Sequence, residues 1–276
     1  MNERAISVRQ RFSTSLTFGS VCVTLLLLLV FVGPLLLPYA PEAQDLAERL
    51  QPPSLSHLLG TDNFGRDLLT RMLYAGRVDL QIGVLATLYT FLIGSTLGAL
   101  AGLFAGWFDA LTMRFVDIAL AFPLLVLMIA IVALLGPGLP NLYVAIGLVG
   151  WIPYARLVRG EVLVTKNLDY IAAARALGAS DGQLLRWHLL PNAIVPALVL
   201  AASSVTSNIL VAAALGYLGL GVRPPDPEWG AMIADARGFL QTAPGLILFP
   251  GLALSLTGLA FSVLGDGLAD ALRPEH

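Results

Sequence analysis

Side chains that could carry out catalysis or bind a metal ion are few in this chain and lie far apart. The histidines are His57, His188 and His276, and the single cysteine is Cys22. Their separations do not match the short spacings of structural zinc ligands, so we predict no metal site and no bound cofactor. Lys166 is the only lysine, and no glycine-rich phosphate loop ending in Gly-Lys-Ser or Gly-Lys-Thr occurs. We therefore expect no enzymatic activity and no ATP hydrolysis by this chain itself.

The segment from residue 168 to residue 191 instead has the composition of a docking surface. Leu168–Leu177 is rich in alanine, a strong helix former whose small side chain lets a partner approach the backbone closely. Gly178 suits the left-handed residue that ends a helix, and Ser180 and Gln183 match a capping box that starts a second one. The pattern predicts a rigid helix–turn–helix, the alternative being an ordinary loop with two amphipathic pieces.

The overall composition is that of a membrane protein with several spans. Hydrophobic residues make up 57% of the 276 residues, charged residues make up 12%, and the mean hydropathy is +0.80. A soluble domain carries about 25% charged residues, so a globular protein with a large core is excluded. The net charge is −2 and no basic tract is present, which gives no indication of a nucleic-acid partner.

Six apolar segments are long enough to cross a membrane, which takes about 20 residues. The breaks between them fall at charged segments and at Gly136–Asn141, where glycine and proline interrupt a long charge-free stretch. We therefore predict an all-α membrane protein with six transmembrane helices, at approximately Leu16–Leu37, Leu80–Gly106, Thr112–Leu135, Asn141–Leu157, Asn192–Tyr217 and Ala243–Leu264.

The distribution of basic residues predicts a cytoplasmic N-terminus, because loops rich in Lys and Arg stay inside. The inner segments then hold ten basic residues: Arg4, Arg9, Arg11, Arg114, Arg156, Arg159, Lys166, Arg175, Arg186 and Arg273. The outer segments hold six: Arg49, Arg66, Arg71, Arg77, Arg223 and Arg237. This orientation places residues 158–188 in the cytoplasm, and Pro38–Asp79 and Gly221–Thr242 outside.

The outer segment Gly65–Asp79 has the pattern of an amphipathic helix lying at the membrane surface. Its apolar residues share one face of a helix: Leu68, Leu69, Met72 and Leu73. We therefore divide the chain into residues 1–79, an N-terminal anchor helix with an extracytoplasmic amphipathic segment, and residues 80–276, a five-helix core that contains the loop 158–188.

Glycine spacing in the second predicted helix indicates close helix packing. Gly94, Gly98, Gly102 and Gly106 recur every four residues and so share one face. Such faces of small residues let transmembrane helices approach one another closely.

The loop segment resembles the cytoplasmic coupling loop of ABC-transporter permeases. That family's pattern is Glu-Ala-Ala, three residues, Gly, nine residues, Ile, any residue and Leu-Pro, and Gly178, Leu190 and Pro191 are in register with it. Further motifs are similar to the second permease subunit, the dipeptide-permease C type, of dipeptide, oligopeptide and nickel importers. They are Leu59-Gly60-Thr61-Asp62, Gly65-Arg66-Asp67, Gly136-Pro137-Gly138, Tyr154–Arg159, Leu218–Pro225 and Glu228-Trp229-Gly230.

This resemblance implies the type I ABC importer permease fold with a cytoplasmic coupling helix, in the inner membrane of a bacterium. It also implies four kinds of contact: a second permease subunit, two ATP-binding subunits, an extracytoplasmic substrate-binding protein and membrane lipid. The residues that would contact an ATP-binding subunit are Asp169, Ala172, Ala173, Ala174, Gly178, Ala179, Leu190 and Pro191. Two positions depart from the family pattern, because Ala172 stands where its glutamate does and His188 where its isoleucine does.

The fifth predicted helix carries a polar patch at Ser203, Ser204, Thr206, Ser207 and Asn208. The resemblance implies that this helix lines the translocation path, while hydrogen bonding between helices is the alternative. The expected cargo is a di- or oligopeptide, and nickel or a metal chelate is the alternative. A secondary, ion-coupled transporter is the rival class, but the predicted spans lack the carboxylate–histidine pair that proton-coupled carriers use.

Overall fold

A computed structural model describes residues 2–272 of the chain, with side chains described from Thr14 onward. Arg273 and His276 lie outside the described residues. In chain order the α-helices are α1 (Asn2–Val32), α2 (Leu68–Phe104), α3 (Gly106–Leu120), α4 (Leu124–Leu135), α5 (Leu139–Gly150), α6 (Ile152–Thr165), α7 (Asp169–Ala176), α8 (Asp181–Leu184), α9 (Leu190–Tyr217), α10 (Trp229–Asp235) and α11 (Gly245–Leu272). The short turns are the 3-10 helices η1 (Gly33–Leu36), η2 (Leu46–Glu48) and η4 (Arg237–Phe239) and the π-helical turn η3 (Leu185–Leu189).

The fold is mostly helical, and five stretches of the described chain are long and apolar enough to cross a membrane. They are Thr14–Leu36, Leu68–Phe104, Leu139–Thr165, Asp181–Tyr217 and Gly245–Leu272. A sixth span exists only if α3 and α4 are counted together, and these two helices meet at a bend of 89°. The predicted all-α membrane fold is confirmed, with five or six spans.

The third predicted helix, Thr112–Leu135, is wrong as a single straight element. The chain turns at Ala121–Pro123, between α3 and α4. Pro123 lacks a backbone donor and disfavours a helical conformation in the residue before it, so the helix ends there. The fourth predicted helix is longer than expected, because α5 and α6 together run from Leu139 to Thr165.

The outer segment Gly65–Asp79 is not a separate surface helix. Its residues from Leu68 onward form the start of α2, which continues without interruption to Phe104, so the predicted division at residue 79 falls inside one helix. Asp67 caps that helix, since its side chain accepts a hydrogen bond from the Thr70 amide at 2.7 Å. The charged side chains of this segment are not solvated but form hydrogen bonds and ion pairs with other parts of the protein.

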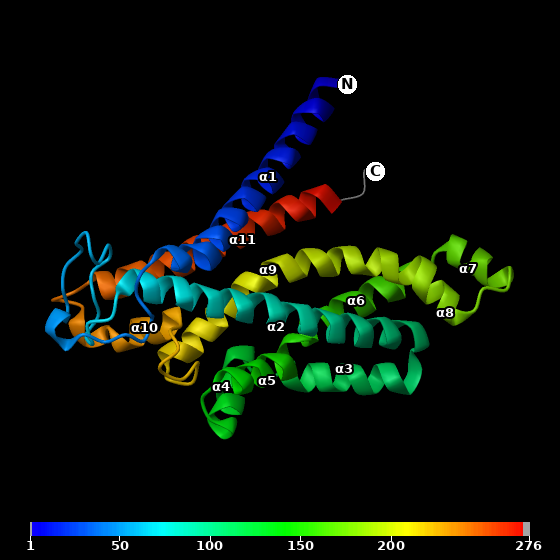
Figure 1. Ribbon diagram of the computed structural model, residues 1–276. Coiled ribbons are helices and arrows are strands. Elements are labelled where there is room, and N and C mark those ends of the chain that lie inside the picture. Colours follow the sequence, from blue (N-terminus) through cyan, green and yellow to red (C-terminus); the bar gives the residue numbers. More distant parts are fainter. Residues whose placement is uncertain (1, 273–276) are drawn as a thin grey trace.

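The helices pack as a membrane bundle with two distinct ends. Helices α2, α6 and α9 pack against one another, and α1 lies along α11 (Figure 1). At one end of the bundle lie α7 and α8, and at the other lie residues 38–67 and α10 (Figure 1). The start of α1 and the end of α11 extend away from the bundle (Figure 1). The cytoplasmic location of the coupling loop and of both ends of the chain stays a prediction.

Candidate functional site

The predicted helix–turn–helix forms, and its local geometry is fixed by backbone hydrogen bonds. After α7 the Ala179 amide donates to the Ala174 carbonyl at 3.1 Å, and the Gly178 amide donates to the Arg175 carbonyl at 3.0 Å. This pair of bonds is a Schellman motif, whose left-handed residue is Gly178 with φ +92°. Ser180 then forms the predicted capping box of α8 with Gln183. The turn between the two helices is therefore a defined structure.

The coupling segment is anchored to the spans through its apolar side. Ile171, Leu184 and Leu189 are almost completely buried and belong to one cluster of apolar side chains. The same cluster contains Val158 and Val162 of α6 and Ala193 and Ala197 of α9. Helix α7 is thus held against the inner ends of two spans.

The opposite side of the coupling segment is exposed and carries mostly small side chains. Of the eight predicted coupling residues, Asp169, Ala172, Ala173, Gly178 and Pro191 are exposed, and Ala174, Ala179 and Leu190 are half-buried. The structure brings α7 beside the start of α9, where Asn192 Nδ2 donates to the Tyr170 hydroxyl at 3.5 Å. These residues therefore lie on one part of the molecule and can contact one partner.

Two exposed side chains of this surface escaped sequence reasoning. Leu177 is 90% exposed and Trp187 is 66% exposed. They line an open depression together with Ala174, Gly178, Ala179, Gln183 and His188. An exposed tryptophan within a charged loop was the available signal, because such a side chain is typical of a contact surface.

Three of the four predicted packing glycines lie against α6 or the residue before it. A Cβ at Gly94 would lie 2.6 Å from Tyr154 Cβ, and one at Gly98 would lie 2.9 Å from Ala155 Cα. A Cβ at Gly102 would lie 2.8 Å from Val162 Cβ. All three positions therefore admit only glycine without displacing the neighbouring helix.

The fourth glycine, Gly106, requires a correction. It lies outside α2 as the first residue of α3, with φ +64°, and a Cβ there would meet no atom within 4 Å. A glycine at this position allows the positive φ of the turn between α2 and α3, where the preceding Ala105 also has a positive φ of 52°.

Charged groups tie α2, α3 and α6 together at the end of the bundle nearest α7. Arg159 pairs with Asp109 through two nitrogens, with Nη2 at 2.6 Å from Oδ2. Lys166 Nζ donates to the Gly102 carbonyl at 2.7 Å. The only lysine of the chain therefore caps the inner end of α2, where a cation is favourable.

The polar patch of α9 divides into two groups. Asn208 is buried and donates to Thr87 Oγ1 of α2 at 2.9 Å, and Thr206 Oγ1 donates to the Gly258 carbonyl of α11 at 3.3 Å. These two side chains join helices of the same chain. Ser203 and Ser207 are exposed, and Ser204 is half-buried and donates its hydroxyl hydrogen to the Leu200 carbonyl. Of the polar patch, only the serines therefore remain available to line a path.

At the end of the bundle opposite α7, which we call the outer end after the predicted orientation, a buried histidine holds residues 38–67 to the start of α2. His57 Nδ1 lies 2.9 Å from Asp67 Oδ2, and Nε2 lies 2.9 Å from Glu48 Oε2. Its ring stacks on Tyr39 at a centroid distance of 4.7 Å. Burial lowers the pKa of His57, but the hydrogen bonds to Asp67 and Glu48 outweigh it, so the net pKa is raised above its ordinary value. The protonated ring can donate to both carboxylates at once.

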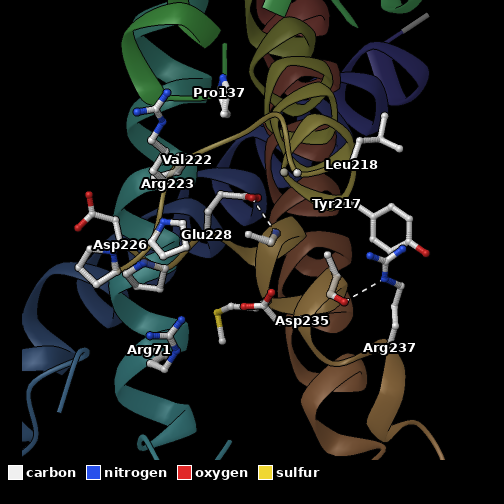
Figure 2. A pocket seen from close by; sticks show the side chains of 18 of the residues that line it. Arg71, Pro137, Tyr217, Leu218, Val222, Arg223, Asp226, Glu228, Asp235 and Arg237 are labelled. Carbon is white, nitrogen blue, oxygen red and sulfur yellow. Dashed lines mark hydrogen bonds between the residues drawn. The ribbon is translucent and has the colours of Figure 1, made fainter. Parts of the chain in front are cut away.

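Beside this histidine cluster lies a cavity of about 300 Å³ whose lining is strongly charged. Figure 2 shows its walls, formed by the start of α2, the turn at Pro137, the loop after α9 and helix α10. Glu228 caps α10 by accepting from the Gly230 amide at 2.6 Å and the Ala231 amide at 2.8 Å. Burial raises the pKa of Glu228, and the buried Asp79 of α2 accepts the neighbouring Trp229 amide at 3.1 Å.

The fold and the coupling segment define a class of protein, the membrane permease of the type I ABC importer fold. The structure is similar to the MetNI methionine ABC transporter in its inward-facing conformations, with a TM-score of 0.58 and 20% identity. That similarity covers 74% of this chain and 97% of the other. It concerns the fold, since the sequences differ widely.

Sequence comparison defines the family. Residues 94–275 match the family described as "Binding-protein-dependent transport system inner membrane component", and residues 14–53 match the "N-terminal TM domain of oligopeptide transport permease C". The chain is 44% identical over 257 residues to the dipeptide transport system permease protein DppC of Alkalihalophilus pseudofirmus, covering 93% of this chain and 84% of that protein. It is 44% identical over 254 residues to the glutathione transport system permease protein GsiD of Pectobacterium atrosepticum, covering 92% and 84%.

The chain therefore belongs to the binding-protein-dependent transport system inner membrane component family, with the N-terminal domain of the C-type permeases. It is a multi-pass membrane permease of an ABC importer. This membership confirms the resemblance seen in the coupling loop and outer motifs, and it argues against an ion-coupled carrier.

Proposed function

We propose that this chain is one of two membrane-spanning subunits of an ATP-driven importer of short peptides in the bacterial inner membrane. A second permease subunit completes the translocation path, two ATP-binding subunits dock on the cytoplasmic side, and a binding protein delivers cargo from outside. The chain itself binds no cofactor and hydrolyses no ATP in this proposal. Its N-terminus is cytoplasmic.

The observation that carries the proposal is the coupling segment between α6 and α9. It is a rigid turn with an exposed alanine-rich helix on one side and an apolar anchor to two spans on the other. A partner that moves this surface would move α6 and α9 with it. Ala172 replaces the family's acidic residue, so docking here depends on shape and backbone approach, with Asp169 and Trp187 as the flanking contacts.

For the path we propose the exposed serine face of α9, formed by Ser203 and Ser207 with Ser204 beside them. Ser203 and Ser207 are exposed within a helix that is otherwise largely apolar, which marks the face that meets a second subunit or the cargo. Asn208 belongs to packing, because its amide is already bound to Thr87 of α2.

For the cargo we propose di- or oligopeptides. The relatives described above carry the names of dipeptide and glutathione permeases, and a di/tripeptide transport system permease protein of Pseudomonas aeruginosa is 43% identical over 263 residues. Within the described residues no group of three or more His, Cys, Asp and Glu side chains could hold a metal ion. Nickel or a metal chelate remains the alternative, and mass spectrometry of ligands on the co-purified binding protein decides between them. A metal or metallophore with no bound peptide would overturn the peptide assignment.

Site-specific cross-linking tests the docking surface. On a Cys22→Ser background, Ala173→Cys should cross-link to an ATP-binding subunit in inverted membrane vesicles, because Ala173 is exposed on α7. Leu55→Cys is the matched control, since Leu55 is 99% exposed at the opposite end of the molecule. Cross-linking at position 55, or at neither position with the complex assembled, would refute the proposed docking and orientation.

A further inference from the structure

The outer cavity is separate from the coupling surface and from the serine face of α9. It measures about 300 Å³, within the lower range of cavities that hold small ligands. It is formed by segments far apart in the sequence, so its shape depends on the whole outer end of the fold (Figure 2). The charges on its walls indicate what it can hold.

One wall of the cavity carries an excess of positive charge. Arg66 Nε lies 2.6 Å from Asp62 Oδ2, and Arg71 Nε lies 3.4 Å from the same oxygen, so two guanidinium groups share one carboxylate. Arg71 is only 4% exposed, and its Nη1 donates to the Pro41 carbonyl at 3.0 Å. Its Nη2 has no hydrogen-bond partner within the described part of the chain. A buried guanidinium with an unused donor, lining a cavity, is a site for an anionic group.

Arg223 adds a second cation, at the end of the cavity opposite Arg71 (Figure 2). It is exposed on the loop after α9, lies beside the turn at Pro137, and forms no ion pair with any residue from 2 to 272 (Figure 2). Arg237 also lines the cavity but is engaged, since its Nε donates to the Ala234 carbonyl at 3.0 Å and its guanidinium lies 5.0 Å from the Tyr217 ring centroid.

The facing wall, on α10, presents a carboxylate. Asp235 is exposed and takes part in no ion pair among the described residues. In Figure 2 its carboxylate and the Arg71 guanidinium are directed toward the same space, yet they form no salt bridge within 4.0 Å. Glu228 is not free to serve this purpose, because both of its oxygens accept amide hydrogens of α10. Opposite charges therefore face one cavity, and Asp235 attracts the Arg71 guanidinium across it without forming a salt bridge.

We propose that this cavity binds a short zwitterionic peptide, with the α-carboxylate on Arg223, a peptide carbonyl oxygen on the unused donor of Arg71 and the α-ammonium on Asp235. The inference rests on the proposed function as a peptide importer and gives that function a cargo subsite on the permease itself. A simple anion would leave Asp235 unpaired, and a simple cation would leave both arginines unpaired. A free peptide neutralises the two walls together.

Binding of dialanine to the assembled transporter tests this subsite. The permease–ATPase complex is placed in nanodiscs without the binding protein, and saturation-transfer NMR measures the affinity for Ala-Ala, N-acetyl-Ala-Ala and Ala-Ala-amide. Each blocked peptide should bind roughly tenfold more weakly, the size expected when one charge-assisted hydrogen bond is lost. Equal affinities for the three peptides would overturn the proposal.

Variants assign the two ends of the peptide. Asp235→Asn should weaken Ala-Ala roughly tenfold yet leave N-acetyl-Ala-Ala unchanged, and Arg223→Gln should do the same for the amidated peptide. Glu42→Gln and Arg49→Gln, exposed charges of the outer segment that do not line the cavity, should leave all three affinities unchanged. Loss of affinity in these controls equal to that in the cavity variants would refute the assignment.

Uptake by the complete transporter separates this inference from the function on which it rests. Import of labelled Ala-Ala in vesicles that contain the binding protein tests the peptide function. Active import without selective binding at the cavity overturns the subsite alone. Selective binding without any import overturns the proposed function and leaves the subsite intact.

Discussion

Substituting Gly98 by alanine should destabilise the protein, because α2 and α6 touch at this point backbone to backbone. The new Cβ would lie 2.9 Å from Ala155 Cα and 3.0 Å from its carbonyl carbon, with the carbonyl oxygen closer still. Ordinary contacts of a Cβ begin at 3.4 Å, so the helices must separate by at least about half an ångström. A backbone cannot rotate away as a side chain can. Overpacking of this kind costs about 2 kcal/mol.

The matched control is Gly160→Ala in α6, where a Cβ would meet no atom within 4 Å. Thermal unfolding of the detergent-solubilised complex, followed by size-exclusion chromatography with fluorescence detection, measures both variants. A loss of about 2 kcal/mol corresponds to a Tm lower by roughly 4–8 °C, whereas Gly160→Ala should leave the Tm unchanged or raise it slightly. Gly98→Leu should prevent assembly. If Gly98→Ala and Gly160→Ala melt within about 1 °C of each other, the close approach of the helices is wrong.

Three further predictions test other parts of the molecule. Gly178→Leu should lower the Tm by roughly 2–8 °C, because a residue with a side chain adopts φ +92° only at a cost of roughly 1–2 kcal/mol. It should also uncouple ATP hydrolysis from uptake, because the leucine side chain obstructs docking; normal uptake would contradict this. The pKa of His57 is raised in the folded state, so its stabilisation of the outer segment should be complete below about pH 6.5 and lost as the pH rises through the folded pKa. Proteolysis of residues 38–67 should therefore increase at alkaline pH in the wild type. A His57→Gln variant should show no such dependence on pH. Asn208→Leu should lower the free energy of unfolding by roughly 0.6–1.7 kcal/mol, because the hydrogen bond to Thr87 is lost, and it should retain transport. Ser207→Leu should instead reduce transport with an unchanged Tm. The reverse pattern would exchange the assigned roles of the two residues.

The sequence predicts the spans and the coupling turn because both depend on local patterns. Apolar length identifies a span regardless of its neighbours. The turn after α7 likewise needs only Gly178 for the left-handed residue and the Ser180–Gln183 capping box, and the structure shows both. The bend at Pro123 was also readable locally, but the surrounding apolar run concealed it.

The outer end could not be predicted, because its charges are satisfied by residues distant in the sequence. Arg71 is one of the polar residues that give Gly65–Asp79 the pattern of a surface helix, and Asp79 ends that segment, yet both are buried. Arg71 binds the Pro41 carbonyl, 30 residues away, and Asp79 accepts the Trp229 amide, 150 residues away. A periodicity argument treats every charge as solvated and therefore assigns such a segment to the surface.

Helix α2 gives the two ends of the molecule a direct mechanical connection. It has 37 residues and contains no proline, so it is a continuous rod about 55 Å long. At its outer end Asp67 holds His57, and along its inner half the glycine contacts prevent α6 from sliding past it. Since α6 shares an apolar cluster with α7, a displacement applied at α7 reaches residues 38–67 as movement of a rigid body, without an intervening joint in α2.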